Sequence, residues 1–380
     1  MTFPYEQLRR RPDVEAPGLV AADAADRLLL DESADARADL DAAAAGAAGG
    51  LVVIGDAYGA LTLGAIHAGA RGVRVHQDAV TGEEALAANA GALGMRPDFA
   101  SMPLTAPLVE GARVVLLRLP RSLDALRDVA GLIAAHASPD VVVYAGGRIK
   151  HMSTAMNDVL RTHFSSLDIT HARQKSRVLV ARSPRDGRDP EPAASVVDGM
   201  QVRAFGGAFA GARLDIGTRL LLAHLPVSFP PGAGTREDPL LDLACGTGVI
   251  AAHLALHHLG LHVVASDQSA VAVASALETM AANGVADRVE VVRDDALRSR
   301  ADASASFIAL NPPFHSGAAV SDRVAPRLFA DAARVLRPGG ELWAVWNSPL
   351  GYRPTLERLV GPTRQVARDA KFTVTVSTRR

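Results

Sequence analysis

The residues best suited to chemistry lie in one short segment, Asn311-Pro312-Pro313-Phe314, which follows an apolar run. The two prolines fix φ and remove two N–H donors, so the segment presents hydrogen-bond acceptors in a stiff shape. An exocyclic amine on an aromatic base is a poor nucleophile because its lone pair is delocalised into the ring. The side-chain oxygen of Asn311 and the carbonyl oxygen of Pro312 could each accept one N–H and draw that lone pair out of conjugation. Phe314 could stack on a base removed from its helix, whereas the alternative interpretation is a structural double-proline loop.

A second candidate site is the glycine-rich turn DLACGTG, residues 242–248, which joins a predicted strand to a predicted helix. Glycines let the backbone approach a ligand closely, and the helix N-terminus offers free N–H groups at its positive dipole end. Asp267 ends the next predicted strand and could accept both ribose hydroxyls, and Asp295 ends the third and could meet an adenine amine. Each acid taken alone could instead be a solvated strand end. The candidate cofactor-binding residues are Asp242, Ala244, Gly246, Gly248, Asp267, Gln268, Asp295, Ala296 and Asn311.

Alternating strands and helices in the second half of the chain place these residues at strand ends. Strands are predicted at 239–244, 261–267, 289–295, 306–312 and 341–347, with helices at 249–259 and 269–284. This alternation implies a parallel sheet with right-handed crossovers. Residues 364–369 and 371–380 alternate with period two, which predicts a closing antiparallel hairpin. The whole pattern resembles the outline of class I S-adenosylmethionine-dependent methyltransferases.

The first half of the chain repeats this outline, which favours a duplication. Residues 51–66 resemble 240–254 when Gly59 is aligned with Gly248. Two predicted helices that end in Ala-Ala-Asn, at 87–89 and 281–283, follow in the same order. We therefore expect an α/β protein with two tandem Rossmann-like domains, the catalytic one having a seven-stranded, mostly parallel sheet.

The first copy departs from the second at the chemically important positions. It lacks the acid before its turn and has one glycine where the second copy has two. It also reads Leu119-Pro120 where the second reads Asn311-Pro312. We infer a first domain that has kept the fold and lost the chemistry. Because Pro, Gly, Asp and Ser gather at 181–199, the predicted division is a degenerate domain at 1–185, a linker at 186–199 and a catalytic domain at 200–380.

The composition excludes several classes of protein. The 380 residues carry a formal charge of −1, which excludes a protein coated in positive charge, such as a histone. One cysteine excludes a disulfide framework and a multi-cysteine metal site. His253 and His257 share a helix face, but no HExxH motif completes a site, so we expect no metal. Because no uncharged apolar run reaches the roughly 18 residues that span a membrane, we expect a soluble, cytoplasmic protein with no membrane partner.

Residues 200–380 are similar to the catalytic half of the bacterial ribosomal-RNA guanine-N2 methyltransferases of the RsmC/RlmG type. The degenerate N-terminal copy is also a property of that family. The resemblance implies S-adenosylmethionine as cofactor, a guanine N2 in 16S or 23S ribosomal RNA as the acceptor, and naked RNA or a ribosomal subunit as partner. A monomer is expected. The segments that carry the resemblance are FAGARLDIGTRLLL (209–222), LLDLACGTGVI (240–250), AANG (281–284), NPPFHSG (311–317) and LRPGGELW (336–343).

The resemblance also implies roles for individual residues. The guanine would be held by the catalytic residues Asn311, Pro312 and Phe314, and His315 would line the same pocket. Residues 214–218 would cover the cofactor near its amino-acid end. The cofactor itself would be bound by Asp242, Gly246, Gly248, Asp267 and Asp295.

A basic stretch at the end of the first domain is a candidate RNA contact. Residues 141–188 carry nine basic and three acidic side chains, although the whole chain is nearly neutral. Lys150, Arg173 and Lys175 are the residues that we expect to grip phosphates. Ordinary variation of surface charge is the alternative.

Four rival functions remain open on the sequence alone. A glutamine-amide methyltransferase acting on a release factor also uses an Asn-Pro-Pro motif, usually followed by Tyr, and an N6-adenine methyltransferase uses the same chemistry. From another class comes a ribosome-assembly or RNA-binding protein that has lost catalysis. A nicotinamide dehydrogenase shares the glycine turn but leaves residues 311–314 unexplained.

Overall fold

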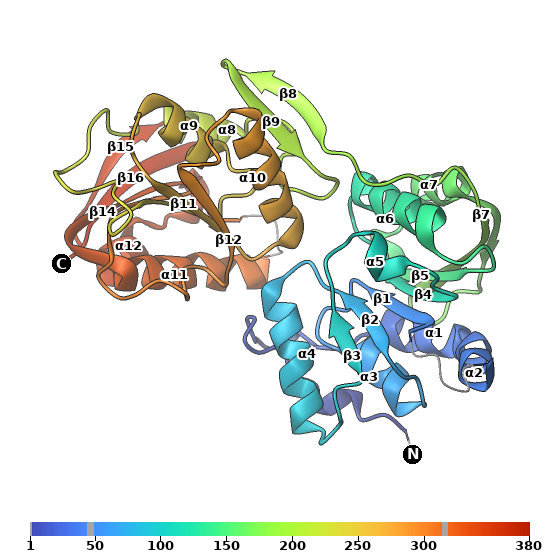
Figure 1. Ribbon diagram of the computed structural model, residues 1–380. Coiled ribbons are helices and arrows are strands. Elements are labelled where there is room, and N and C mark those ends of the chain that lie inside the picture. The colour runs from blue at the N-terminus through green and yellow to red at the C-terminus, as the bar shows by residue number, and fades with distance from the viewer. Residues whose placement is uncertain (1, 44–48, 314–317) are drawn as a thin grey trace. The chain divides into compact units, whose positions relative to one another are not determined.

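The computed structural model describes residues 2–43, 49–313 and 318–380, and the chain divides into two compact units, Met1–Glu191 and Pro192–Arg380. Within the described residues, each unit is an α/β domain built on one seven-stranded sheet (Figure 1). The strand orders are β3-β2-β1-β4-β5-β7-β6 and β12-β11-β10-β13-β14-β16-β15. In both sheets the last two strands run antiparallel to their neighbours and the others are parallel. The predicted fold class is therefore confirmed, including the closing hairpin.

The two sheets are built from short strands. In the first unit they are β1 (Leu51–Ile54), β2 (Val73–His76), β3 (Phe99–Ser101), β4 (Val114–Arg118), β5 (Val142–Arg148), β6 (Phe164–Ile169) and β7 (Ser176–Pro184). In the second they are β10 (Leu240–Leu243), β11 (Val263–Asp267), β12 (Val289–Arg293), β13 (Ala305–Leu310), β14 (Leu336–Asn347), β15 (Thr363–Arg368) and β16 (Phe372–Thr378). Strand β14 begins at Leu336, five residues before the strand that the sequence predicted at 341–347.

Helices cover both faces of each sheet. The first unit has α1 (Ala24–Glu32), α2 (Ala34–Ala43), α3 (Ala60–His67), α4 (Val80–Ala92), α5 (Ala106–Val109), α6 (Leu123–His136) and α7 (Thr154–His163). The second has α8 (Ile216–Leu222), α9 (Val249–His257), α10 (Ala270–Ala282), α11 (Ala318–Val335) and α12 (Arg353–Leu359). None of the helices in the described part of the chain is long and apolar enough to cross a membrane.

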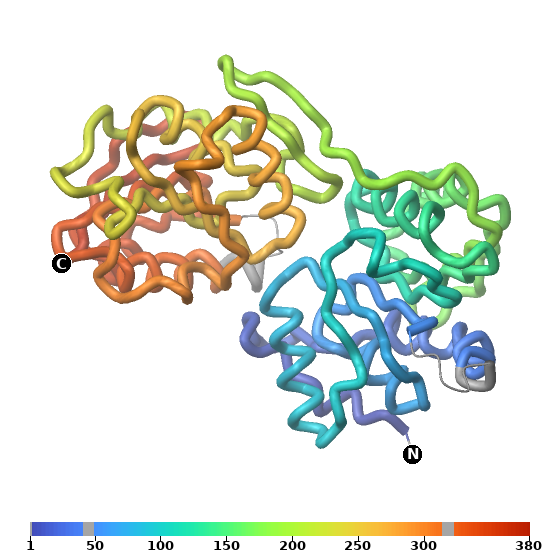
Figure 2. The backbone as a smooth tube through the Cα atoms, in the orientation of Figure 1, coloured from blue at the N-terminus to red at the C-terminus, as the bar shows by residue number. Residues whose placement is uncertain are grey.

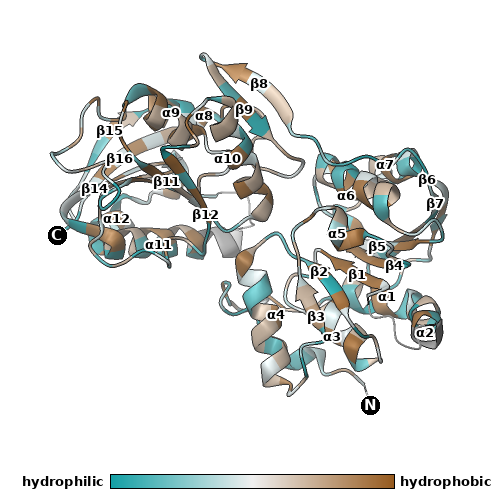
Figure 3. Cartoon of the chain, in the orientation of Figure 1, coloured by the Kyte–Doolittle hydropathy of each residue, from teal (hydrophilic) through white to brown (hydrophobic). Residues whose placement is uncertain are grey.

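Successive residues of each central strand enter different cores. Leu240 packs into one cluster of the second unit, and its neighbour Leu241 packs into the other. Leu51 and Val52 divide in the same way in the first unit. Strands buried on both faces are continuous apolar runs, which explains why the sequence shows them without alternation (Figure 3). Each fully buried Leu or Val contributes on the order of 1.5–3 kcal/mol to stability.

Equal strand orders support the duplication, but two details of the sequence comparison were wrong. Helix α4 continues to Ala92, so the Ala-Ala-Asn at 87–89 does not end it. Asn89 is instead buried, and its amide bonds both backbone groups of Arg9, at 2.9 and 2.8 Å. Leu119-Pro120 was aligned one residue off, because Leu117 pairs with Ile54 as Leu310 pairs with Leu243. The register places Arg118, the next residue, at the position of Asn311.

The segment predicted as a linker at 186–199 is structured at both ends. Arg185 and Arg188 donate backbone N–H groups to carbonyls of α7 and α6, over 2.8 and 3.1 Å. From Ala193 the chain forms a hairpin of β8 (Ala193–Val197) and β9 (Met200–Ala204), which Figures 1 and 2 show as a projecting ribbon. Polar side chains of α10 bond the backbone of β9, so the hairpin is part of the second unit; they are Ser275, Thr279 and Asn283.

Candidate active site

The glycine-rich turn after β10 contains three residues in the left-handed region. Ala244, Gly246 and Gly248 have φ of 57°, 55° and 77°. A Cβ on Gly248 would lie 2.7 Å from Cε of Met280 and 3.0 and 3.2 Å from Cβ and Cα of Ala276 in α10, so glycine suits this close helix approach and this φ. A Cβ on Gly246 would meet nothing within 4 Å, so the turn is open on that side. An open backbone beside a helix N-terminus fits the close approach that a nucleoside cofactor requires.

Asp267 joins the glycine turn to the end of β11. Its Oδ2 accepts the backbone N–H of Gly246 and its Oδ1 that of Ser269, both over 2.9 Å. The next residue, Gln268, is exposed. The carboxylate is therefore fixed at the strand end that the sequence predicted, beside the open face of the turn.

Asp242 lies beneath the turn rather than in the open cleft, which differs from the expected direct contact with the cofactor. It is 0% exposed, and its Oδ2 accepts the N–H of Ala251 in α9 over 2.9 Å. Within the described residues, its Oδ1 is buried without a hydrogen-bond partner. Burial, reinforced by the charge of Asp267, raises the pKa of Asp242 to about 7. We interpret Asp242 as a support for the turn and the start of α9.

Asn311 follows β13 and is held by the segment that begins α8. Its Nδ2 donates to Oγ1 of Thr218 over 2.9 Å and to Oδ2 of Asp215 over 3.2 Å. Its Oδ1 is buried and has no hydrogen-bond partner among the residues that the structure describes. A buried acceptor without a donor is costly, and such groups often mark a site that a ligand completes. Pro312, the next predicted acceptor, is also buried.

A cleft brings these segments together. It is lined by Ala244 and Gly246 of the turn, by Asp215 and Thr218, and by Asn311. The sequence therefore predicted three residues of the lining as site residues and implied the other two through the resemblance. Phe314 and His315 lie outside the described residues.

Two further residues line this cleft without a role from the sequence. The ring of Phe209 is 47% exposed, and Arg213 is also exposed. Their only signal in the sequence was their place within the 209–222 segment. An exposed aromatic ring and a cation at the rim of a cleft fit a nucleotide, which offers a flat base and a phosphate.

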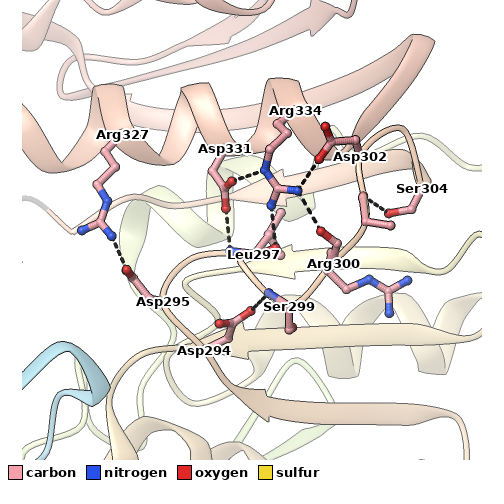
Figure 4. Close-up of polar contacts among 11 residues, drawn as sticks. Asp294, Asp295, Leu297, Ser299, Arg300, Asp302, Ser304, Arg327, Asp331 and Arg334 are labelled. Carbon is pink, nitrogen blue, oxygen red and sulfur yellow. Dashed lines mark hydrogen bonds and ion pairs between the residues drawn. The ribbon is translucent and has the colours of Figure 1, made fainter. Parts of the chain in front are cut away.

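Asp295 is fixed to the helix that follows the asparagine segment. It forms an ion pair with Arg327 of α11 (Figure 4). Further along α11, the carboxylate of Asp331 accepts the backbone N–H of Leu297 and the guanidinium of Arg334 donates to its carbonyl, each over 2.8 Å. Ala296, between these residues, has a φ of 58° and accepts the Ser266 hydroxyl over 2.5 Å. The loop predicted to meet adenine is thus ordered by α11, a set of contacts that no local sequence pattern predicts.

Cys245 in the turn is a packing residue. Its side chain is buried, and burial beside Asp267 and Asp242 raises the pKa of the thiol well above its usual range. The thiol therefore stays protonated at neutral pH and is a weak nucleophile. Within the described residues, no three His, Cys, Asp or Glu side chains gather as a metal site.

The first unit fills the equivalent site with its own side chains. Asp56 is buried in the turn and accepts the N–H groups of Gly59 and Thr62, over 3.0 and 2.8 Å. Arg118, at the position of Asn311, pairs with Asp23 and Asp26. A guanidinium has donors only, so it cannot accept an amine N–H.

The predicted RNA-binding residues of the first unit divide into two kinds. Lys150 and Lys175 are exposed, and a bond from Ile149 N to Lys175 O over 2.9 Å brings their segments together. Arg173 instead pairs with Asp31 over 2.8 Å, so its charge is partly compensated.

The sheet order and the open glycine turn after its first strand define this protein as a class I methyltransferase. Two family models match it: the methyltransferase small domain over residues 199–376 and the RLMG N-terminal domain over residues 2–185. A ribosomal RNA large subunit methyltransferase G from Streptomyces avermitilis is 36% identical, covering 98% of this chain and 97% of that protein. One from Shewanella amazonensis is 30% identical, covering 97% and 94%. The chain belongs to the ribosomal RNA large subunit methyltransferase G family, which confirms the resemblance drawn from its sequence.

A solved structure extends the comparison of the fold. The T. thermophilus 16S rRNA N2 methyltransferase RsmC, solved in complex with AdoMet and guanosine, covers 100% of this chain and of its own, with a TM-score of 0.70 and 21% identity. At this identity the likeness concerns the fold: a tandem arrangement of two such units.

Proposed function

We propose that this protein transfers the methyl group of S-adenosylmethionine to the exocyclic N2 amine of a guanine in ribosomal RNA. The single observation that carries the proposal is the Oδ1 of Asn311, which lies at the strand end beside the glycine turn and is buried with no hydrogen-bond partner in the described part of the chain. The chain's relatives are named for ribosomal RNA of the large subunit, and RsmC was solved with AdoMet and guanosine. An amine bound at Asn311 would supply the donor that Oδ1 lacks.

The glycine turn and the acids that end β11 and follow β12 offer groups that suit the parts of the cofactor. The open turn at Gly246 would approach its amino-acid and ribose parts, and Asp267 would accept the ribose hydroxyls. Asp295, held by Arg327, would meet the adenine amine. S-adenosylmethionine supplies an electrophilic methyl group on a sulfonium.

Catalysis by this chain would consist of positioning and polarising the amine. Asn311 Oδ1 and the Pro312 carbonyl each accept one N–H, so the nitrogen lone pair turns out of the ring plane and toward the donor. Removing one pre-positioned hydrogen-bonding group of this kind typically costs on the order of 10²–10³ in kcat. Phe209 at the rim, and Phe314 beyond the proline pair, would stack on the base.

The test of this function is to identify the product. Purified protein is incubated with labelled S-adenosylmethionine and, separately, 16S RNA, 23S RNA and assembled subunits, and the labelled nucleoside is mapped. We expect N2-methylguanosine, with 23S RNA or the large subunit labelled in preference to the small one. Label in N6-methyladenosine, or in a glutamine amide of a release factor added in parallel, would contradict the proposal.

For the first unit we propose a role in holding the RNA. Arg121, Arg148 and Lys150 surround His151 closely enough to lower the pKa of its imidazole, after the effect of burial. Arg121 follows β4, which has the place of β13 in the strand order, and Arg148 ends the neighbouring strand β5. A backbone hydrogen bond from Ile149 to Lys175 brings Lys175 next to Lys150. A cluster of cations with few acids fits a phosphate backbone. We infer that residues 1–185 support the catalytic domain at 200–380 in this way, and that the protein acts in the cytoplasm as a monomer.

A further inference from the structure

The amide of Asn311 is gripped from one side by the cap of a helix. Its Nδ2 donates to Thr218 Oγ1 over 2.9 Å and to Asp215 Oδ2 over 3.2 Å. Asp215 is the N-cap of α8, and the same Oδ2 accepts the backbone N–H of Thr218 over 3.1 Å. Thr218 is only 7% exposed. Both acceptors are therefore fixed by helix capping and burial and do not depend on flexible side chains.

These two hydrogen bonds determine which end of the Asn311 carboxamide faces the cleft. A half-turn about the last side-chain torsion exchanges the donating Nδ2 and the accepting Oδ1. In the flipped orientation Oδ1 would lie against the Asp215 carboxylate, where two acceptors repel. The flipped Nδ2 would then face the N–H groups of a bound amine, where two donors repel. Only the observed orientation leaves Oδ1 free to accept.

We propose that Asp215 and Thr218 form a clamp, here the α8 clamp, that holds the Asn311 amide in its accepting orientation and thereby increases the rate of methyl transfer. Both are positioning residues, since they act through Asn311. The proposal rests on the proposed function above for the nature of the amine. It assigns the two residues to the target side of the cleft, not to the cofactor.

The first unit shows the same cap with a different residue beside it. Asp23 is the N-cap of α1, and Asp26, three residues on, matches the spacing of Asp215 and Thr218. Arg118, at the position of Asn311, donates to both acids, over 2.8 and 2.7 Å. The clamp geometry has thus persisted in a unit whose clamped residue has no accepting end. In the second unit the clamp holds the amide in one of two orientations. A guanidinium carries only donors, so the two acids of the first unit do not choose between a donating and an accepting end.

A double-mutant cycle tests the α8 clamp. Thr218→Val removes the hydroxyl acceptor and keeps the branched shape of the side chain. We expect it to lower kcat about tenfold, with KM for RNA and the Kd of S-adenosylmethionine within about twofold of the unsubstituted protein. Thr218→Ser restores the acceptor and should recover most of kcat. In an Asn311→Ala background, measured by single turnover with excess enzyme, Thr218→Val should change the rate by less than about twofold.

Two results would overturn the clamp. If Thr218→Val lowered the rate of methyl transfer by the same factor in the unsubstituted protein and in Asn311→Ala, Thr218 would not act through the Asn311 amide. A raised Kd of S-adenosylmethionine with unchanged kcat would place Thr218 at the cofactor. The methylated nucleoside is identified for the unsubstituted protein in the same assay, so an unexpected product would contradict the proposed function and leave the cycle interpretable.

Discussion

Nη1 of Arg118 lies 2.7 Å from Oδ1 of Asp26, whose pKa burial raises to about 6 despite this cation. The same nitrogen bonds Asp23, so one guanidinium pairs with two acids at the start of α1. The pair occupies the place that, in the second unit, holds Asn311 and its α8 clamp. In the first unit this place is therefore taken by a structural ion-pair network.

Removing this arginine should destabilise the first unit. In Arg118→Ala the two acids lose their cation, and breaking such a partly buried network costs about 2–3 kcal/mol. The pKa of Asp26 should rise further, so the loss is largest at high pH and shrinks as pH falls below that pKa. Calorimetric unfolding of the full chain at pH 8 and pH 5 measures the difference, with Arg118→Lys as the control that keeps the charge. A loss that did not depend on pH would contradict this account.

Asn311 should be the residue whose substitution lowers turnover most. Asn311→Ala removes the accepting oxygen, and we expect kcat to fall about 10²–10³-fold while S-adenosylmethionine affinity changes little. The matched control is Asn283→Ala, which removes another amide of the same unit that bonds the backbone of β9 and α10. That variant should retain kcat within about twofold below its melting temperature. Full activity of Asn311→Ala on its RNA would refute the mechanism.

Asp242 should make the stability of the second unit depend on pH. Its folded pKa of about 7 exceeds the 3.8 of an ordinary aspartate, so the folded chain binds more protons between these two values. Stability should therefore fall as pH rises from about 4 to about 7, by on the order of 4 kcal/mol in total, and then level off. Asp242→Asn keeps an acceptor for the Ala251 N–H and should remove this pH dependence. Unfolding by denaturant at several pH values compares the two proteins, and parallel curves would refute the prediction.

Ala244 should be a strained residue that glycine relieves. It has a φ of 57°, where a Cβ is unfavourable, so Ala244→Gly should stabilise the unit by about 1 kcal/mol. Gly246 has a φ of 55° with open space around its missing Cβ, so Gly246→Ala introduces the same strain without a collision. Gly246→Ala should therefore destabilise the second unit by a similar amount. Thermal unfolding without cofactor measures both variants, and shifts of the same sign would contradict the explanation.

Charge reversal should reveal whether the first unit holds RNA. Lys150→Glu with Lys175→Glu should raise the Kd for RNA and lower the slope of log K against log salt by about 2. Arg173→Glu should have a smaller effect because Asp31 already compensates this arginine. Binding titrations at several salt concentrations give both quantities. An unchanged affinity and salt slope in all three substitutions would end the assignment.

The parts of the site that could be predicted are those marked by a pattern within a few neighbouring residues. The glycine turn, the acids at the ends of β11 and β12, and the asparagine after β13 follow from local pattern, because a parallel sheet brings its carboxyl ends to one edge. The prediction that α4 ends at Asn89 was wrong, although it concerned a local feature. Asn89 there is buried against Arg9 while Ala87 and Ala88 are exposed, and a short repeated triplet carries no information on burial.

The sequence by itself determined two α/β domains, the duplication, and the position of the asparagine and turn, since hydrophobic period and backbone-restricting residues act over a few residues. Only the tertiary structure decided what these residues contact. Asn311 bonds Asp215, which is 96 residues away, and Asp295 pairs with Arg327, which is 32 residues away. Such partners depend on which helix caps and loops the packed sheet brings together, and no spacing rule relates them. The orientation of one amide, and with it the chemistry of the site, is therefore a property of the folded chain.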